Sequence, residues 1–200
     1  MQWTDIFDAG NMKYILMIVL AGICLPVLYM FKRREGETLA KLSGFFGGPG
    51  SDSSGLVFNG NYAGIPFRIE LHQGSKYSPR RMEVLYSRPF PFPLAVYKEH
   101  FLSRVGKSMG LIRDVQTWNP AFDAKFRISS PKENEQAVID FFKRPDKKEA
   151  VLCVFALGFE VLKTTDGGLF AELPGYHIGH IAPEIVEHLL RNMENLYRND

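Results

Sequence analysis

The longest hydrophobic stretch of the chain lies close to the N-terminus. Residues Tyr14 to Phe31 form a run of 18 positions without a charged side chain. As an α-helix this run extends roughly 27 Å, at about 1.5 Å per residue, which just spans bilayer hydrocarbon. A soluble core helix would keep a polar face, and a cleaved signal peptide would begin with basic residues, whereas Asp5 and Asp8 stand here. The pattern therefore predicts a transmembrane helix over residues 14–31, surrounded by membrane lipid.

Basic residues flank this run unevenly. Lys13 precedes it, whereas Lys32, Arg33 and Arg34 follow it directly. Because lysine and arginine near a membrane helix favour the cytoplasmic side, we expect residues 1–13 to be a short non-cytoplasmic tail. The three residues after the helix are then the membrane-proximal basic group, and the C-terminal domain is cytoplasmic.

Glycine and serine dominate the sequence from Ser43 to Gly55. Such a composition is typical of a flexible linker. A phosphate-binding loop is the alternative, but the G-x-x-x-x-G-K-[ST] pattern is absent. Residues 32–55 are therefore predicted to be a juxtamembrane segment and linker, followed by one soluble domain over residues 56–200.

The domain opens with short runs in which hydrophobic and polar residues alternate, as in half-buried strands. Asn59-Gly60-Asn61 separates the first two runs and is a strong hairpin signal. The pattern predicts an antiparallel meander in the first half of the domain. Its strands are expected at Leu56–Phe58, Pro66–His72, Met82–Ser87 and Leu94–Tyr97.

Helical spacing dominates the second half, interrupted by one hairpin. Ser130-Pro131-Lys132-Glu133 has the residues of a capping box and predicts the start of a helix after a short strand at Phe126–Ser129. The fold class expected is α+β, with a largely antiparallel sheet and about three helices. The remaining predicted elements are a helix at Asp146–Leu157, strands at Phe159–Thr164 and Leu169–Leu173, and a closing helix at Pro183–Tyr197.

Composition narrows the class of partner. The 200 residues include 46% hydrophobic residues, enough for a packed core, and the net charge is only +2. A nucleic-acid partner is therefore not expected. The two cysteines, Cys24 and Cys153, lie in separate apolar segments, so no disulfide is predicted, and Cys153 is expected to be buried and inert.

Three histidines near the C-terminus are weak candidates for metal ligands. His177, His180 and His188 surround two glutamates, and imidazoles with carboxylates suit zinc. Their spacing differs from a helical H-E-x-x-H motif, and ordinary surface histidines are the commoner outcome. No metal and no cofactor are predicted.

Asp123 is the most distinctive polar residue of the domain. It follows Asn119-Pro120 and lies between Phe122 and Phe126. Such an aspartate is either an acid in a cleft or a turn residue that bonds its own backbone. Ser129 and Lys132 have the spacing of a serine nucleophile and a lysine base, but the accompanying motifs are missing. No catalytic residue is predicted.

Basic side chains recur in two groups, and both are read as solvated surface or as groups facing anionic lipid. The groups are Lys76, Arg80, Arg81 and Arg88, and Lys143, Arg144, Lys147 and Lys148.

Several of these features occur together in a known group of proteins. The N-terminal anchor, Phe122-Asp123-x-x-Phe126-x-Ile128 and Thr165-Asp166-Gly167-Gly168 resemble a group of uncharacterised bacterial membrane-anchored proteins. The resemblance implies a bacterial source and brings no activity, cofactor or catalytic residue.

These observations favour a membrane-tethered, non-enzymatic interaction or scaffold module. A single-pass anchor would hold its cytoplasmic domain at the cell inner membrane, where the domain binds a protein partner. The alternative is a membrane-attached small-ligand sensor or hydrolase-like enzyme with a cleft near Asp123 and His177/His180.

Overall fold

The computed structural model describes residues 22–30, 33, 36–37, 40–41, 44, 50–52, 55–76, 78–98 and 114–198. The chain divides into two compact units, Met1–Ala40 and Lys41–Asp200. Within the first unit, residues 22–30 form a helix in which every residue is exposed. The predicted membrane helix lies outside the described residues except at these nine positions. Among the described residues, no helix has the length and apolar character needed to cross a bilayer.

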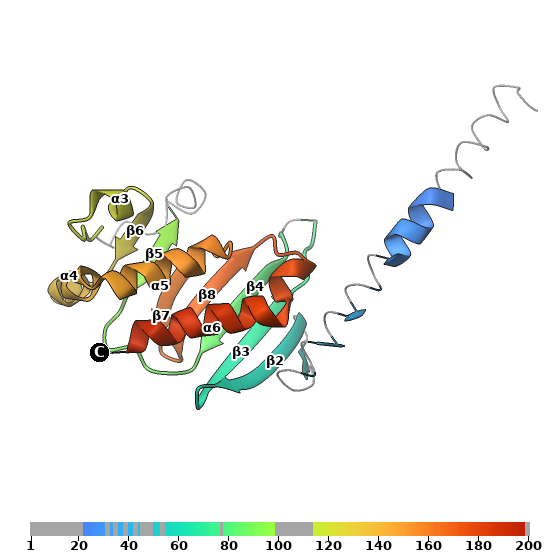
Figure 1. The fold of residues 1–200 in the computed structure, drawn as a ribbon, viewed down its shortest axis with the longest axis horizontal. Helices are drawn as coiled ribbons and strands as arrows, with labels where there is room; N and C mark the ends of the chain where they lie inside the picture. Colours follow the sequence, from blue (N-terminus) through green and yellow to red (C-terminus); the bar gives the residue numbers. More distant parts are fainter. Residues whose placement is uncertain are drawn as a thin grey trace, which may run out of the picture. The chain divides into compact units, whose positions relative to one another are not determined.

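The second unit is an α+β domain built on one sheet, in which every strand pairing is antiparallel (Figure 1). The strand order is β1-β2-β3-β4-β8-β7-β5-β6. The strands are β1 Gly50–Asp52, β2 Gly55–Tyr62, β3 Ile65–His72, β4 Arg81–Tyr86, β5 Ala95–Lys98, β6 Phe126–Ser129, β7 Val161–Thr165 and β8 Gly168–Pro174. The helices are α3 Pro120–Asp123, α4 Glu135–Lys143, α5 Pro145–Ala156 and α6 Pro183–Tyr197, with short 3₁₀ turns η3 Lys132–Asn134 and η4 Ile178–Ile181.

The core lies on one face of the sheet, and a single row of cross-strand partners runs through its centre. All seven side chains of this row are fully buried. They are Phe58, Ile69, Val84, Ala171, Leu162, Val96 and Ile128. Helices α5 and α6 lie across the sheet in Figure 1, and each contributes buried apolar side chains. The strands and the amphipathic helices thus bury their apolar sides against one another. Because only one side of each element is buried, apolar residues recur every second position in the strands and at helical spacing in the helices, and this recurrence identifies the elements in the sequence.

The turn between β2 and β3 differs from the prediction. It lies at Ala63-Gly64, where both residues have positive φ angles of 52° and 82°, as in a type I′ hairpin turn. The predicted turn at Asn59-Gly60-Asn61 is wrong because Gly60 pairs with Phe67 inside the ladder. A Cβ atom at Gly60 would lie 2.7 Å from Phe67 Cε1 and closer still to Cζ. Gly60 therefore leaves room for the Phe67 ring and is not a turn residue.

The predicted meander is correct only as far as β4. Strands β8 and β7 lie between β4 and β5, so the C-terminal hairpin occupies the middle of the sheet. The proline-rich segment after β4 leads the chain away, since prolines cannot donate to a ladder. Its Phe90 ring packs edge-on against Phe141 and Tyr197, at centroid distances of 5.6 and 5.2 Å. These contacts show that the segment packs within the domain.

The capping box predicted at residues 130–133 does not form. Ser130 is buried, and its hydroxyl donates a hydrogen bond of 2.6 Å to the carbonyl of Pro93. The chain then makes the 3₁₀ turn η3, and α4 begins at Glu135. Ser130 therefore joins the loop before β5 to the strand β6, because a buried hydroxyl needs a partner and the Pro93 carbonyl supplies it.

Both edges of the sheet are short. Strand β1 contains three residues. At the other edge, the backbone of Ile128 is already engaged on its outer side: its N–H donates to Asp114 Oδ1 at 3.2 Å, and its carbonyl accepts from the Val115 N–H at 2.8 Å. This cover matters because an exposed strand edge is a template for pairing with another chain.

Candidate functional site

Asp123 fixes the loop that precedes α3. Its carboxylate accepts from the Thr117 hydroxyl at 2.7 Å and from the Thr117 N–H at 3.1 and 3.2 Å. Asn119 caps the same short helix by accepting from the Phe122 N–H at 3.2 Å. The carboxylate is thus occupied by backbone and hydroxyl donors, which matches the turn interpretation of this residue.

The loop held by Asp123 presents Trp118 to solvent. This indole is 82% exposed, although tryptophan is usually largely buried. Its backbone adopts a φ of 60°, the left-handed region that non-glycine residues seldom enter. A strained backbone and an exposed tryptophan on one rigid loop make a candidate contact residue. The sequence pattern indicated Asp123 as a candidate but did not indicate Trp118, whose loop Asp123 holds.

The three C-terminal histidines do not form one ligand set. His177 and His180 stack at a centroid distance of 3.7 Å, and the His177 N–H donates to His180 Nδ1 at 3.2 Å. Burial lowers the pKa of His180, and the adjacent His177 lowers it further. His188 lies separately on α6. Asp123 precedes edge strand β6, whereas His177 follows β8, and two strands separate β8 from β6 in the sheet.

A polar groove of about 600 Å³ runs between α5 and α6. Its lining mixes charges of both signs with amides, among them Arg144, Asp146, His188 and Asn195. Cys153 also lines it and is half-buried, so the prediction that Cys153 is buried is wrong. Small-molecule pockets are mostly apolar with a few polar groups, and this lining is the reverse.

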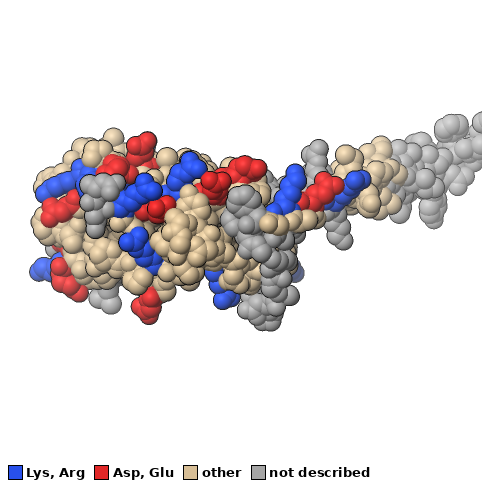
Figure 2. Space-filling model, turned by 60° about the horizontal axis from the view of Figure 1, so that its bottom comes forward, with Lys and Arg blue, Asp and Glu red and all other residues tan. Residues whose placement is uncertain are grey.

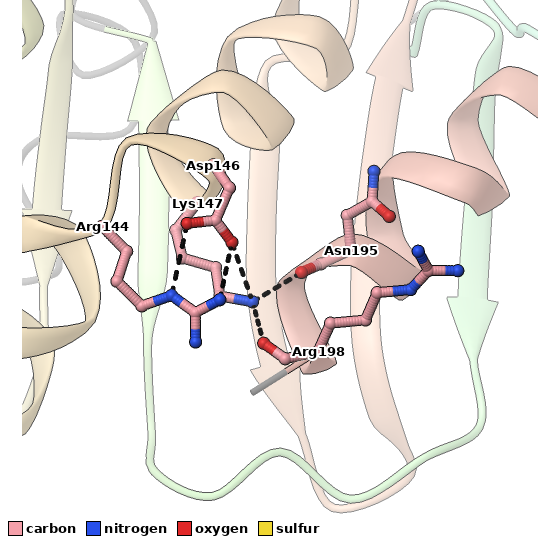
Figure 3. Close-up of polar contacts among 5 residues, drawn as sticks. All are labelled: Arg144, Asp146, Lys147, Asn195 and Arg198. Carbon is pink, nitrogen blue, oxygen red and sulfur yellow. Dashed lines mark hydrogen bonds and ion pairs between the residues drawn. The ribbon is translucent and has the colours of Figure 1, made fainter. Parts of the chain in front are cut away.

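Lys147 joins the two helices beside this groove (Figure 3). Its side chain is 1% exposed, and its ammonium group donates to the carbonyls of Asn195, at 2.6 Å, and of Arg198. Because the last carbonyls of a helix have no partner within it, Lys147 caps α6 from the first turn of α5. The expectation that Lys147 belongs to a solvated basic surface is therefore wrong.

Other basic residues are paired with acids. Arg144 donates two hydrogen bonds to Asp146, at 3.2 and 2.9 Å, and this contact lowers the pKa of the Asp146 carboxyl. Arg33 of the first unit pairs with Glu37 at 3.0 Å, whereas Lys32 and Arg34 lie outside the described residues. Figure 2 shows positive and negative side chains interspersed on the visible face of the domain.

The sheet face away from α5 and α6 carries a cluster that the sequence did not reveal. Glu70, Glu83 and Glu172 are direct partners on β3, β4 and β8. His72 lies two residues after Glu70, with its Nε2 atom 3.5 Å from a Glu70 oxygen and 3.4 Å from a Glu83 oxygen. The sequence itself shows alternating polar positions in β3 and β4. Their meeting depends on strand register, which the pattern alone does not supply.

Glu70 and Glu83 of this cluster each form an ion pair with an arginine. Arg68 Nε lies 2.7 Å from Glu70 Oε1, and Arg81 Nε lies 2.8 Å from Glu83 Oε1. Burial raises the pKa of the Glu172 carboxyl, and neighbouring Glu83 raises it further. Like charges directly opposite one another destabilise a sheet, so this row depends on nearby cations.

Comparison with protein-family models, with curated proteins and with solved structures finds no match to this chain.

Proposed function

We propose that the protein is a single-pass membrane-tethered interaction module whose C-terminal domain binds a protein partner through Trp118. The observation that carries the binding function is the exposed indole on a loop fixed by Asp123. The tether places the module at the inner membrane of a bacterial cell.

The helix at residues 22–30 supports the tether. Leu28, Tyr29 and Met30 are 63, 68 and 58% exposed, and as consecutive residues they point to different sides of the helix. A helix that is apolar all round is normally enclosed by a protein core or by lipid. Since these side chains are exposed within their own unit, bilayer hydrocarbon is the environment that suits them.

The orientation follows from the basic residues after the predicted membrane helix. Lys32, Arg33 and Arg34 favour the cytoplasmic side of the membrane. The domain after the linker would then lie in the cytoplasm. A reporter fused to the C-terminus tests this directly: green fluorescent protein is expected to fluoresce there, and alkaline phosphatase to be inactive. An active phosphatase fusion would reverse the orientation.

Trp118 has the properties of an interface anchor. Tryptophan is enriched among residues that dominate binding energy, because it buries a large apolar area at a small cost in conformational entropy. The hydrogen bonds from Thr117 to Asp123 order the loop before any partner arrives, which lowers the cost of binding. The expected partner therefore offers an apolar pocket for one indole.

Fractionation of cells that express the full chain tests the tether. The wild type is expected in the membrane pellet after alkaline extraction. A Leu25→Arg, Leu28→Arg variant should move to the supernatant, since each arginine near a helix centre costs about 2.5–3.5 kcal/mol on insertion. Leu152→Arg, at an exposed apolar position of α5, is the matched control and should stay in the pellet. A wild type found in the supernatant would refute the tether.

A photoreactive amino acid at position 118 of the full chain, in its native membrane, tests the partner. One adduct of defined mass is expected, with none from the same amino acid at position 152. Asp123→Ala should reduce the yield because it releases the loop, whereas His177→Ala should leave it unchanged. Equal yields from positions 118 and 152, or no effect of Asp123→Ala, would exclude a Trp118 interface.

A further inference from the structure

The geometry points to a metal site: we infer that Glu70, His72 and Glu83 bind one divalent transition-metal ion of the zinc class. One ligand atom from each residue lies within 4.8 Å of the other two. The site is independent of the tether and of Trp118. It lies on the sheet face opposite to the helices α5 and α6.

His72 provides the first independent indication. Its side chain is only 15% exposed, and Nε2 is buried without a hydrogen bond to any residue that the structure describes. A buried polar atom without a partner is costly, and each such atom in a native fold requires an explanation. Carboxylate oxygens of Glu70 and Glu83 face this nitrogen at 3.5 and 3.4 Å, beyond a normal hydrogen bond. His72 thus faces both carboxylates at ion-pair distance, without a hydrogen bond at Nε2.

The size of this gap suits a bound ion. In a tetrahedral zinc site with bonds of about 2.1 Å, two ligand atoms are separated by roughly 3.4 Å. An octahedral ion with the same bond length would bring its ligands to about 3.0 Å. Calcium could also span the gap but strongly prefers oxygen to imidazole. The observed spacing and the donor set of one nitrogen and two oxygens therefore favour tetrahedral zinc or a similar ion.

The surroundings orient the ligands in advance. Arg68 and Arg81 each hold the Oε1 atom of one glutamate, which leaves the Oε2 atoms turned toward His72. Such contacts outside the metal ligands fix their orientation in known metal sites. Glu70 and Glu83 are direct cross-strand partners, so the sheet itself sets their separation.

Three protein ligands leave one coordination position for water or for another molecule. The two glutamates are 25 and 21% exposed, so solvent reaches the cluster. A divalent ion would also offset the repulsion along the row of Glu70, Glu83 and Glu172.

Titration of the detergent-solubilised full chain, first stripped with a chelator, tests this inference with Zn²⁺ and then Co²⁺. One Zn²⁺ per chain is expected, and His72→Gln and Glu83→Gln should each weaken binding at least tenfold. His188→Ala removes an exposed histidine of the same domain and should leave the affinity unchanged. Bound Co²⁺ should give the intense visible absorption of a tetrahedral site.

Thermal unfolding separates loss of the site from loss of the fold. Zn²⁺ should raise the melting temperature of the wild type, because an ion that binds only the folded state stabilises it. The two site variants should melt cooperatively without that increase. No stoichiometric uptake by the wild type, or an equal loss of affinity in His188→Ala, would overturn the inference.

Discussion

Gly60 shows how one residue can carry two opposite signals. Next to asparagine on both sides, it has the composition of a tight turn. In the folded domain it is a strand residue whose missing Cβ admits the Phe67 ring from the partner strand. Local chemistry and cross-strand packing compete at this position, and packing prevails because the Phe67 ring is buried at 2% exposure.

Gly60→Ala is therefore expected to destabilise the domain. The added methyl group would overlap the Phe67 ring, and overpacking of this kind typically costs about 1–3 kcal/mol. Chemical denaturation of the purified protein measures the change. Asn59→Ala, at the exposed neighbouring position, should differ little from the wild type. Equal stability of Gly60→Ala and Asn59→Ala would show that the ring can move aside.

His180 should make the stability of the domain depend on pH. Its pKa is lowered by burial and by His177, so below about pH 6.5 the unfolded chain binds the proton more readily than the folded one. The contribution of His180 is then complete above pH 6.5 and is lost as the pH falls through its folded pKa. Melting temperatures between pH 7 and pH 5 should decline less steeply in His180→Gln than in the wild type. Parallel curves would contradict this assignment.

At the scale of elements, the sequence predicts well what depends on neighbours in the chain. The closing helix α6 begins at Pro183 and ends at Tyr197 as predicted, because proline and the helical apolar stripe define it locally. The hairpin β7–β8 likewise follows from its glycine turn. The position of β5 beside β7, and the meeting of Glu70 with Glu83, depend on pairing between distant segments. Periodicity does not encode that pairing, so the sheet order and the acidic cluster could not be predicted.

Helices α5 and α6 depend on one lysine for part of their association. Lys147→Met keeps most of the aliphatic length but removes the ammonium group that caps α6. Two carbonyls at the end of α6 then lose their partner, and a buried acceptor left without one costs about 1–3 kcal/mol. A lower unfolding free energy is expected in denaturant titration. Lys148→Met is the control, and the same loss in both variants would argue against a specific cap.

At the scale of the molecule, the core belongs to the second unit alone. All buried hydrophobic residues of the described part of the chain lie between Val57 and Tyr197. A chain of residues 41–200 is therefore expected to fold without detergent and to melt at the same temperature as the domain in the full protein. Circular dichroism of both chains tests this. A further truncation that removes α6 should fail to fold, and a disordered 41–200 chain would show that the first unit is required.

The cover on the outer edge of β6 would matter most where many copies of the domain are held on one membrane surface. Proteins tethered as we propose diffuse in two dimensions and collide far more often than in free solution. An uncovered edge strand could form hydrogen bonds with the sheet of a neighbouring copy, as strands do in fibrils. Asp114 and Val115 already occupy the outer hydrogen-bonding positions of Ile128, and β1 offers only three residues at the opposite edge. In a chain tethered as we propose, the same contacts that cover the sheet edge would also limit aggregation between neighbouring copies in the plane of the membrane.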